Sequence, residues 1–126
     1  KWKIVIIGEG PLAGEVQACI KDRGLENVVQ VLRYVDYAKM PLYYAASDLF
    51  LLPSVKDQNP LSVVEAIHSG LPIALSDQAG NIEDAVSEGH NGWKLPVFNE
   101  VEFRKRLEMV FSADFDLLRQ GRRSKA

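Results

Sequence analysis

The sequence predicts an α/β domain with three layers, in which helices cover both faces of a parallel sheet. Short apolar runs bounded by turn residues alternate about five times with segments whose apolar residues recur at helical spacing. The runs lack polar alternation, which is typical of strands buried on both faces. The chain has 126 residues, of which 47% are hydrophobic, so it is long enough to form one domain with its own core.

The composition argues against several classes of partner. The net charge of −2 provides no basic surface for nucleic acid or for an anionic membrane. No apolar run approaches the ~20 residues that a transmembrane helix needs, so we expect no membrane contact through these residues. The single Cys19 cannot form an internal disulfide, and its place in an apolar helical stripe predicts a buried thiol.

The chain opens with a predicted strand at residues 3–7 and a helix at residues 12–24. Between them, Gly8, Gly10 and Ala13 loosely match the dinucleotide fingerprint, in which glycine lets the backbone approach a pyrophosphate. Gly10 is therefore a candidate nucleotide contact. The alternative is that both glycines serve only a tight turn from strand to helix.

A second predicted strand covers residues 28–32 and ends at Arg33, Tyr34 and Val35. These residues lie at the carboxyl end of the strand, the side on which open α/β sheets bind ligands. Arg33 stands where the dinucleotide fingerprint has an acid for the ribose, which leaves a nicotinamide or flavin domain as a remote alternative.

The next predicted elements are a helix at residues 40–46, a buried strand at residues 49–52 and a second helix after a polar loop. In that second helix we expect Asn59 as the cap, Pro60 as the first residue and a stop at Gly70. Tyr43 and Tyr44 of the preceding helix are expected to pack in the core and at the surface.

The start of this second helix is a predicted anion site. Leu61 and Ser62 lie in the first turn and offer unpaired backbone N–H groups at the positive end of the helix dipole. Glu65 lies roughly 9 Å further along the axis, at ~1.5 Å per residue from Asn59. That separation resembles the distance between the diphosphate and the ribose hydroxyls of one nucleotide. A carboxylate is a good acceptor for hydrogen bonds from those hydroxyls. We interpret the helix as a nucleoside-diphosphate clamp; the alternative is that Glu65 is an ordinary solvated residue.

The remaining elements are a strand at residues 71–75, a helix at residues 81–87 capped by Asn81, and a strand at residues 93–95. Asn99 is expected to begin a helix with one apolar face, formed by Phe103, Leu107, Val110 and Phe111. A short helix from Asp114 and a solvated basic end at residues 122–123 complete the prediction. Asp77 is a candidate for the cleft, although an Asp in a turn usually serves turn hydrogen bonds. His68 and His90 are isolated, so we expect no metal site.

Several segments together resemble the retaining family-4 glycosyltransferases of the GT-B fold, also called glycosyltransferase group 1. Asp57 and Glu65 are separated by seven residues, where the family has Glu, seven residues, Glu. The resemblance covers nearly the whole chain and is carried by residues 8–11, 42–48, 51–54, 65–66, 70–74 and 88–93.

The resemblance implies a fold and a set of site residues. The fold is a Rossmann-like α/β/α domain, one half of a GT-B fold. Glu65 and Asp57 form the catalytic pair, with Glu65 on the ribose and Asp57, beside Gln58, on the transferred sugar. The backbone at Tyr34 and Val35 meets the nucleobase, unless Tyr34 is a packing aromatic. The diphosphate contacts fall on Asn59, Leu61 and Ser62.

The resemblance also implies a reaction. Residues 1–126 are expected to be the C-terminal nucleotide-sugar-binding domain, a fragment without its first strand and without the N-terminal domain that binds the acceptor. The full-length enzyme moves a sugar from a UDP-, GDP- or ADP-linked donor to an acceptor hydroxyl with retention, without a cofactor. These residues alone are expected to bind nucleotide weakly and to be inactive. The expected location is cytoplasmic, with membrane association only through the rest of the protein, and the expected process is cell-surface polysaccharide synthesis.

Three departures from the family pattern keep alternatives open. Asp57 is one methylene shorter than Glu, Gln58 replaces a glycine and Arg33 stands where many members have glycine. Asp57 and Arg33 keep a non-catalytic nucleotide-binding domain of the same fold as an alternative. Another GT-B enzyme, such as a sugar epimerase or a phosphorylase, is a further alternative. The base, the sugar, the acceptor and the oligomeric state are left open.

Overall fold

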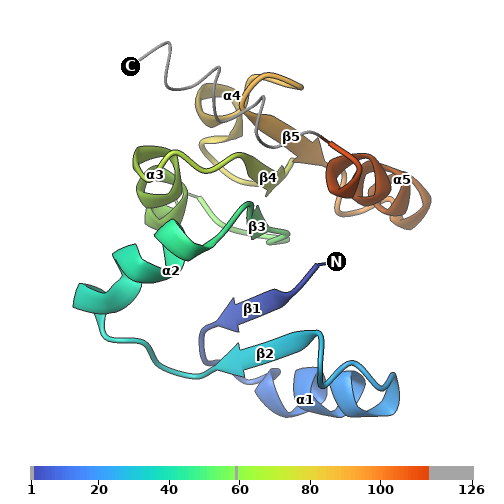
Figure 1. Ribbon diagram of the computed structural model, residues 1–126. Helices are drawn as coiled ribbons and strands as arrows, with labels where there is room; N and C mark the ends of the chain where they lie inside the picture. The colour runs from blue at the N-terminus through green and yellow to red at the C-terminus, as the bar shows by residue number, and fades with distance from the viewer. Residues whose placement is uncertain (1, 59, 114–126) are drawn as a thin grey trace. The chain divides into compact units, whose positions relative to one another are not determined.

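The computed structural model describes residues 2–58 and 60–113, and it divides the chain into two compact units, Lys1–Met40 and Pro41–Ala126. Helices alternate with strands along the described chain (Figure 1), and every strand pairing is parallel. The predicted α/β class is confirmed. The strands are hydrogen-bonded as two sheets, one in each unit.

In the first unit, β1 (Ile4–Ile7) pairs with β2 (Val29–Leu32), and α1 (Ala13–Asp22) connects them. Gly8, directly after β1, has φ 152°, a backbone conformation that L side chains rarely adopt, so the turn requires glycine. The short helix η1 (Tyr37–Lys39) follows β2. The predicted burial of the Cys19 thiol is wrong: Cys19 is exposed, because α1 packs on a sheet of only two strands and buries only Ile20.

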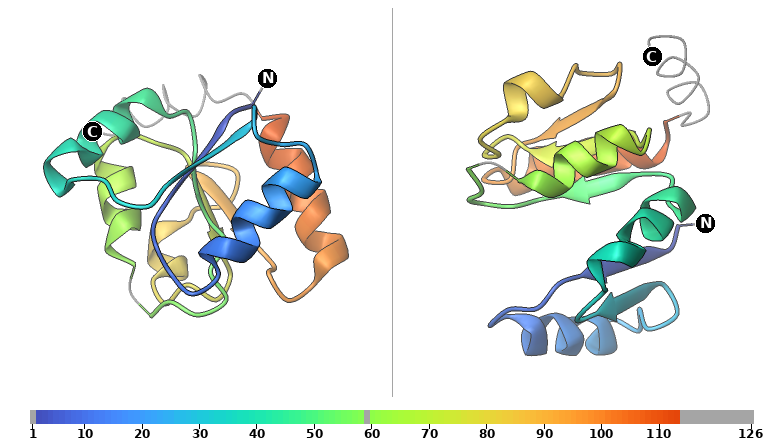
Figure 2. Two further views of the ribbon diagram at one scale, coloured as in Figure 1. Left: turned by 90° about the horizontal axis from the view of Figure 1, so that it is seen from below. Right: turned by 90° about the vertical axis from the view of Figure 1, so that its left-hand side faces the viewer.

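In the second unit, β3 (Phe50–Leu52), β4 (Ile73–Ser76) and β5 (Gly92–Leu95) form a sheet with β4 in the middle. Figures 1 and 2 show α3 (Leu61–His68) and α5 (Glu100–Phe111) on opposite faces of this sheet. All four residues of β4 are buried, because that strand has a neighbour on each side and a helix on each face. This arrangement provides the three predicted layers.

The last described helix covers the core as its periodicity predicts. Asn99 caps α5, since its Oδ1 accepts a hydrogen bond from the Glu102 N–H at 3.2 Å. Val110 is fully buried in a cluster with Ala74, Trp93 and Leu95. The partly buried side chains packed against this cluster are Leu49, Leu51, Val97, Phe103, Leu107 and Ala113.

Most predicted element boundaries are wrong by one or two residues, among them those of α3, β4 and the helix that follows β4. Pro60 is the N-cap of α3 and not its first residue, because its ψ of 112° is extended. β4 begins at Ile73 rather than at residue 71, because Pro72 has no N–H to donate to a neighbouring strand. The Pro72 carbonyl still accepts a hydrogen bond from the Phe50 N–H. The helix predicted for residues 81–87 is only α4 (Ile82–Ala85), and the Asn81 side chain makes no capping hydrogen bond. The predictions for Asp114 and residues 122–123 lie outside the described residues.

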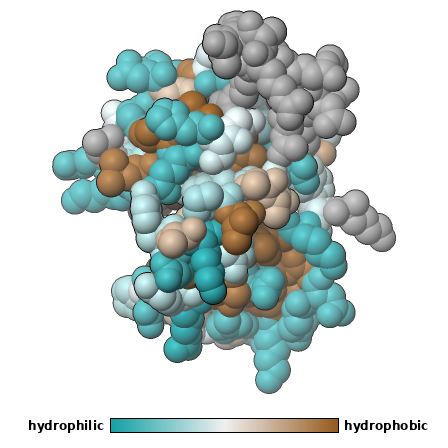
Figure 3. Space-filling view, turned by 60° about the vertical axis from the view of Figure 1, so that its left-hand side comes forward, coloured by the Kyte–Doolittle hydropathy of each residue, from teal (hydrophilic) through white to brown (hydrophobic). Residues whose placement is uncertain are grey.

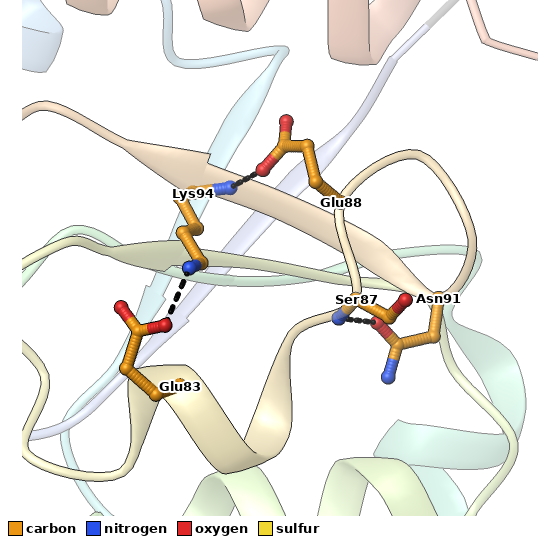
Figure 4. A network of polar contacts seen from close by, with 5 residues as sticks. All are labelled: Glu83, Ser87, Glu88, Asn91 and Lys94. Atoms are coloured by element: carbon orange, nitrogen blue, oxygen red, sulfur yellow. Dashed lines mark hydrogen bonds and ion pairs between the residues drawn. The ribbon is translucent and has the colours of Figure 1, made fainter.

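Side-chain hydrogen bonds hold the loop between α4 and β5 (Figure 4). Asn91 Oδ1 accepts from the Ser87 N–H at 2.7 Å, and Asn91 Nδ2 donates to the Ala85 carbonyl at 2.8 Å. Glu88 Oε2 accepts from the Lys94 N–H at 2.9 Å, and Lys94 Nζ pairs with Glu83 at 3.0 Å. Asn91 therefore supplies bonds that the irregular backbone cannot make for itself.

Apolar side chains also reach the surface, as the brown residues among polar teal ones in Figure 3 show for one face. In β1, Val5, Ile6 and Ile7 are exposed, and in the second unit Leu61 and Phe98 are among the most exposed. Of the helices in the part of the chain that the structure describes, none is long and apolar enough to cross a membrane.

We expect Asn91→Ala to lower the free energy of unfolding by about 2 kcal/mol, because the Ser87 N–H and the Ala85 carbonyl would both lose a partner. Urea unfolding measures the change. Ser87→Ala is the matched control, since Ser87 contributes to this bond only through its backbone. Equal effects of the two substitutions would show that the Asn91 side chain does not hold the loop.

Candidate functional site

Two loops lie against each other at the carboxyl end of the second sheet. Asp57, in the loop after β3, forms a parallel β-bridge with Ala79, in the loop after β4. The Gly80 N–H donates to the Asp57 carbonyl at 2.8 Å. The carboxyl end of a parallel sheet is where α/β proteins bind ligands, and these contacts fix the backbone there.

The two loops approach each other so closely that only glycine fits at position 80. A Cβ on Gly80 would lie 1.7 Å from the Gln58 carbonyl oxygen and 2.8 Å from the Gln58 Cα. The sequence predicted a strand to residue 75 and a helix from residue 81, and it missed this contact in the loop between them. The one available signal was a glycine just before a helix start, at the same sheet edge as the Asp57 loop.

Glu65 lies in the second turn of α3 and is half-buried. The Tyr44 hydroxyl, from α2 (Met40–Ala46), donates to Glu65 Oε2 at 2.8 Å. The Tyr44 ring is buried and packs on Phe50 of β3, with 6.3 Å between ring centroids. The predicted packing role of Tyr44 is confirmed, but its hydrogen bond was missed. Glu65 is thus not an ordinary solvated residue of a helix surface.

The start of α3 presents the donors that the sequence predicts. The Pro60 carbonyl accepts from the Val63 N–H at 3.2 Å, so the N–H groups of Leu61 and Ser62 precede the first hydrogen bond of the helix. Glu65 lies about 6 Å along the axis from Leu61, closer than the roughly 9 Å expected when the helix was taken to start at Asn59. Asn59 itself lies outside the described residues.

Asp57 and Gln58 stand just before this helix start. Asp57 is half-buried and Gln58 is exposed. The helix start of α3 and both predicted acids lie on this one segment, with Asp57 in the loop before the helix and Glu65 in its second turn. Their contacts with a ligand remain predictions.

The other predicted nucleotide contacts lie in the first unit. Gly10 lines an open hollow of about 300 Å³ with mainly apolar walls, formed together with Ile6, Gly8, Glu9, Pro11, Leu12, Ala13, Val16 and Val31. Tyr34 is 82% exposed, so it does not pack as a core aromatic within this unit, and Val35 is half-buried. Their roles in nucleotide binding also remain predictions.

Asp77 serves the turn after β4. Its N–H donates to the Leu95 carbonyl at 2.8 Å, and its Oδ1 accepts from Gln78 Nε2 at 3.2 Å. The Ser76 Oγ accepts from the Gln78 N–H at 3.0 Å and closes the same turn. Within residues 2–58 and 60–113, no group of three His, Cys, Asp or Glu side chains is placed to hold a metal ion.

We expect Gly80→Ala to lower the free energy of unfolding by about 1–3 kcal/mol, because the added Cβ would force the Gln58 backbone away. Gly14→Ala is the control. Gly14 is helical and has open space around it, so alanine there should stabilise the protein by about 0.5–1 kcal/mol. Urea unfolding measures the free energy of unfolding of both variants. An unchanged stability of Gly80→Ala would contradict the close approach of the loops.

Comparison with known proteins connects this geometry to a family. The family model described as "Glycosyl transferases group 1" matches residues 1–125. The amylovoran biosynthesis glycosyltransferase AmsK of Erwinia amylovora is 29% identical over 101 residues, which are 75% of this chain and 25% of that protein. The chain spans only 25 to 31% of the first curated relatives that it matches.

Solved structures share the fold. The HepE protein of Anabaena, solved in complex with UDP and glucose, superposes with a TM-score of 0.78 at 22% identity, over 95% of this chain and 33% of that one. The C-terminal domain of a glycosyl transferase group 1 family protein, LpcC, from Francisella tularensis gives a TM-score of 0.76 at 23% identity, over 94% of this chain and 62% of that one. At these identities the likeness establishes the fold, a Rossmann-like domain as in GT-B glycosyltransferases.

Proposed function

Because the chain belongs to the glycosyl transferases group 1 family, we propose that it binds the nucleotide-sugar donor of a retaining glycosyltransferase. The observation that carries the proposal is the segment from Asp57 to Glu65. It places a carboxylate on each side of a helix start whose first N–H groups precede the helical hydrogen bonds. A diphosphate fits the helix start, and Glu65 then faces a ribose about 6 Å further along the axis.

Each part of this segment has a task in the reaction. Glu65 accepts hydrogen bonds from the ribose hydroxyls and so orients the donor. Asp57 and Gln58 contact the transferred sugar. As the bond from the anomeric carbon to the diphosphate breaks, the N–H groups of Leu61 and Ser62 stabilise the leaving diphosphate, together with the helix dipole. The acceptor hydroxyl oxygen bonds to the anomeric carbon on the face that the diphosphate leaves, and the hydroxyl proton passes to the departing diphosphate oxygen, which becomes more basic as its bond to the sugar breaks.

The proposal extends to the whole protein. We assign the acceptor site to a separate N-terminal domain, so residues 1–126 alone should bind nucleotide but not transfer sugar. The match to a C-terminal domain and the small share of each relative that is covered support this assignment. Tyr34, Val35 and Gly10 are proposed for the nucleotide. No cofactor or resident metal takes part.

The names of similar proteins support a substrate class. A structural neighbour holds UDP and glucose, and AmsK acts in amylovoran biosynthesis. We therefore propose a UDP-, GDP- or ADP-linked sugar as the donor and polysaccharide synthesis as the process. The proposed location is the cytoplasm, with any membrane association made by residues outside this chain.

Calorimetric titration of the full-length protein with UDP, GDP and ADP tests the donor site. We expect saturable binding of one of them, weakened at least tenfold in Glu65→Gln, because the neutral amide is a poorer acceptor for ribose hydroxyls. Glu108→Gln, an exposed residue of α5, is the matched control. If none of the three nucleotides binds, the chain has kept the fold without the donor function.

Asp57→Asn separates the sugar contact from the nucleotide contact. We expect a roughly hundredfold lower kcat for sugar transfer by the full-length enzyme, while the Kd for the nucleoside diphosphate changes less than about threefold. The loop should keep its geometry, since Asp57 bonds to Gly80 through its backbone carbonyl. A loss of nucleotide affinity as large as that in Glu65→Gln would place Asp57 on the nucleotide instead.

A further inference from the structure

A tyrosine hydroxyl from a different helix holds the carboxylate proposed for the ribose. Tyr44 lies 21 residues before Glu65 in the sequence, and its hydroxyl donates to Glu65 Oε2 at 2.8 Å. Tyr44 is only 7% exposed, whereas Glu65 is half-buried. The contact therefore joins a side chain fixed in the interior to one at the rim of the proposed site.

The position of the Tyr44 hydroxyl is set by the sheet. The ring packs on Phe50, with an angle of 47° between the ring planes. Phe50 begins β3, and its N–H donates to the Pro72 carbonyl at 3.0 Å, next to β4. A Phe at position 44 would make the same ring contacts, so packing alone does not account for the hydroxyl.

A glutamate side chain has three rotatable bonds, and a ligand that binds it must fix all of them. A hydrogen bond made before the ligand arrives reduces the conformational entropy that the side chain loses on binding, because the carboxylate is already oriented. An ionised carboxylate accepts several hydrogen bonds, so accepting one from Tyr44 is compatible with accepting others from a ligand.

We infer that Tyr44 is a positioning residue that orients Glu65 for the two ribose hydroxyls of the donor nucleotide. The inference rests on the proposed function and adds a residue that makes no contact with the ligand itself. It predicts that the Tyr44 hydroxyl matters only when both Glu65 and the ribose hydroxyls are present.

The test is a set of titrations of the full-length protein with the nucleoside diphosphate that it binds and with the 2′,3′-dideoxy analogue of that nucleotide. Tyr44→Phe should raise the Kd for the ribonucleotide about fivefold to tenfold and leave the Kd for the dideoxy analogue unchanged. In the Glu65→Ala background, Tyr44→Phe should produce no further change in either Kd, because the carboxylate that Tyr44 orients is absent there. Tyr43→Phe on the same helix is the matched control and should change neither Kd.

Each other outcome overturns the inference. Equal weakening of both nucleotides in Tyr44→Phe would indicate a general packing defect, and loss of cooperative thermal unfolding would show that the fold needs the hydroxyl. If Glu65→Gln weakens binding but Tyr44→Phe does not, the positioning role fails while the proposed function stands. If the unchanged protein binds no nucleotide, the proposed function fails as well.

Discussion

Two loops can lie side by side at the carboxyl end of the second sheet only because residue 80 has no side chain. The Gln58 carbonyl occupies the place that a Cβ would take, and the Gly80 N–H bonds to the Asp57 carbonyl across the same gap. The first loop leads directly into α3, so the position of that helix start depends on this contact. This contact therefore also determines where the N–H groups of Leu61 and Ser62 lie, and where Glu65 lies one turn later.

The alternating pattern of the sequence predicted the strands and most helices, because the burial of a whole run or face leaves a periodic trace. It predicted capping less well, as two asparagines show. Asn99 has extended backbone, with ψ 99°, and its side chain reaches the Glu102 N–H. Asn81 has ψ 18°, and its Oδ1 is buried with no hydrogen-bond partner among the described residues. Both positions are asparagine, but the backbone conformation of the residue before the helix differs between them, and only the extended one lets the side chain reach the first turn.

Only part of the geometry of the candidate site could be predicted from the sequence, for the same reason. The helix start and the two acids occupy one continuous segment, so their spacing could be taken from the sequence. The Tyr44 hydroxyl and the Gly80 backbone come from elements 21 and 15 positions away from Glu65, and tertiary packing alone brings them close. Cys19 shows that a correctly predicted helix does not guarantee burial. Its apolar stripe lies on α1 as predicted, but the two-stranded sheet is too narrow to cover the whole apolar face of that helix.

Asp57 contacts the neighbouring loop through its backbone and not through its carboxylate. Because the bridge to Ala79 and the bond from Gly80 use only main-chain atoms of Asp57, the side chain at position 57 is free to change without disturbing the loop pair. Position 80 has no such freedom. A change from Asp to Glu at position 57 would therefore lengthen the carboxylate side chain by one methylene while the two main-chain contacts that join the loops stay in place.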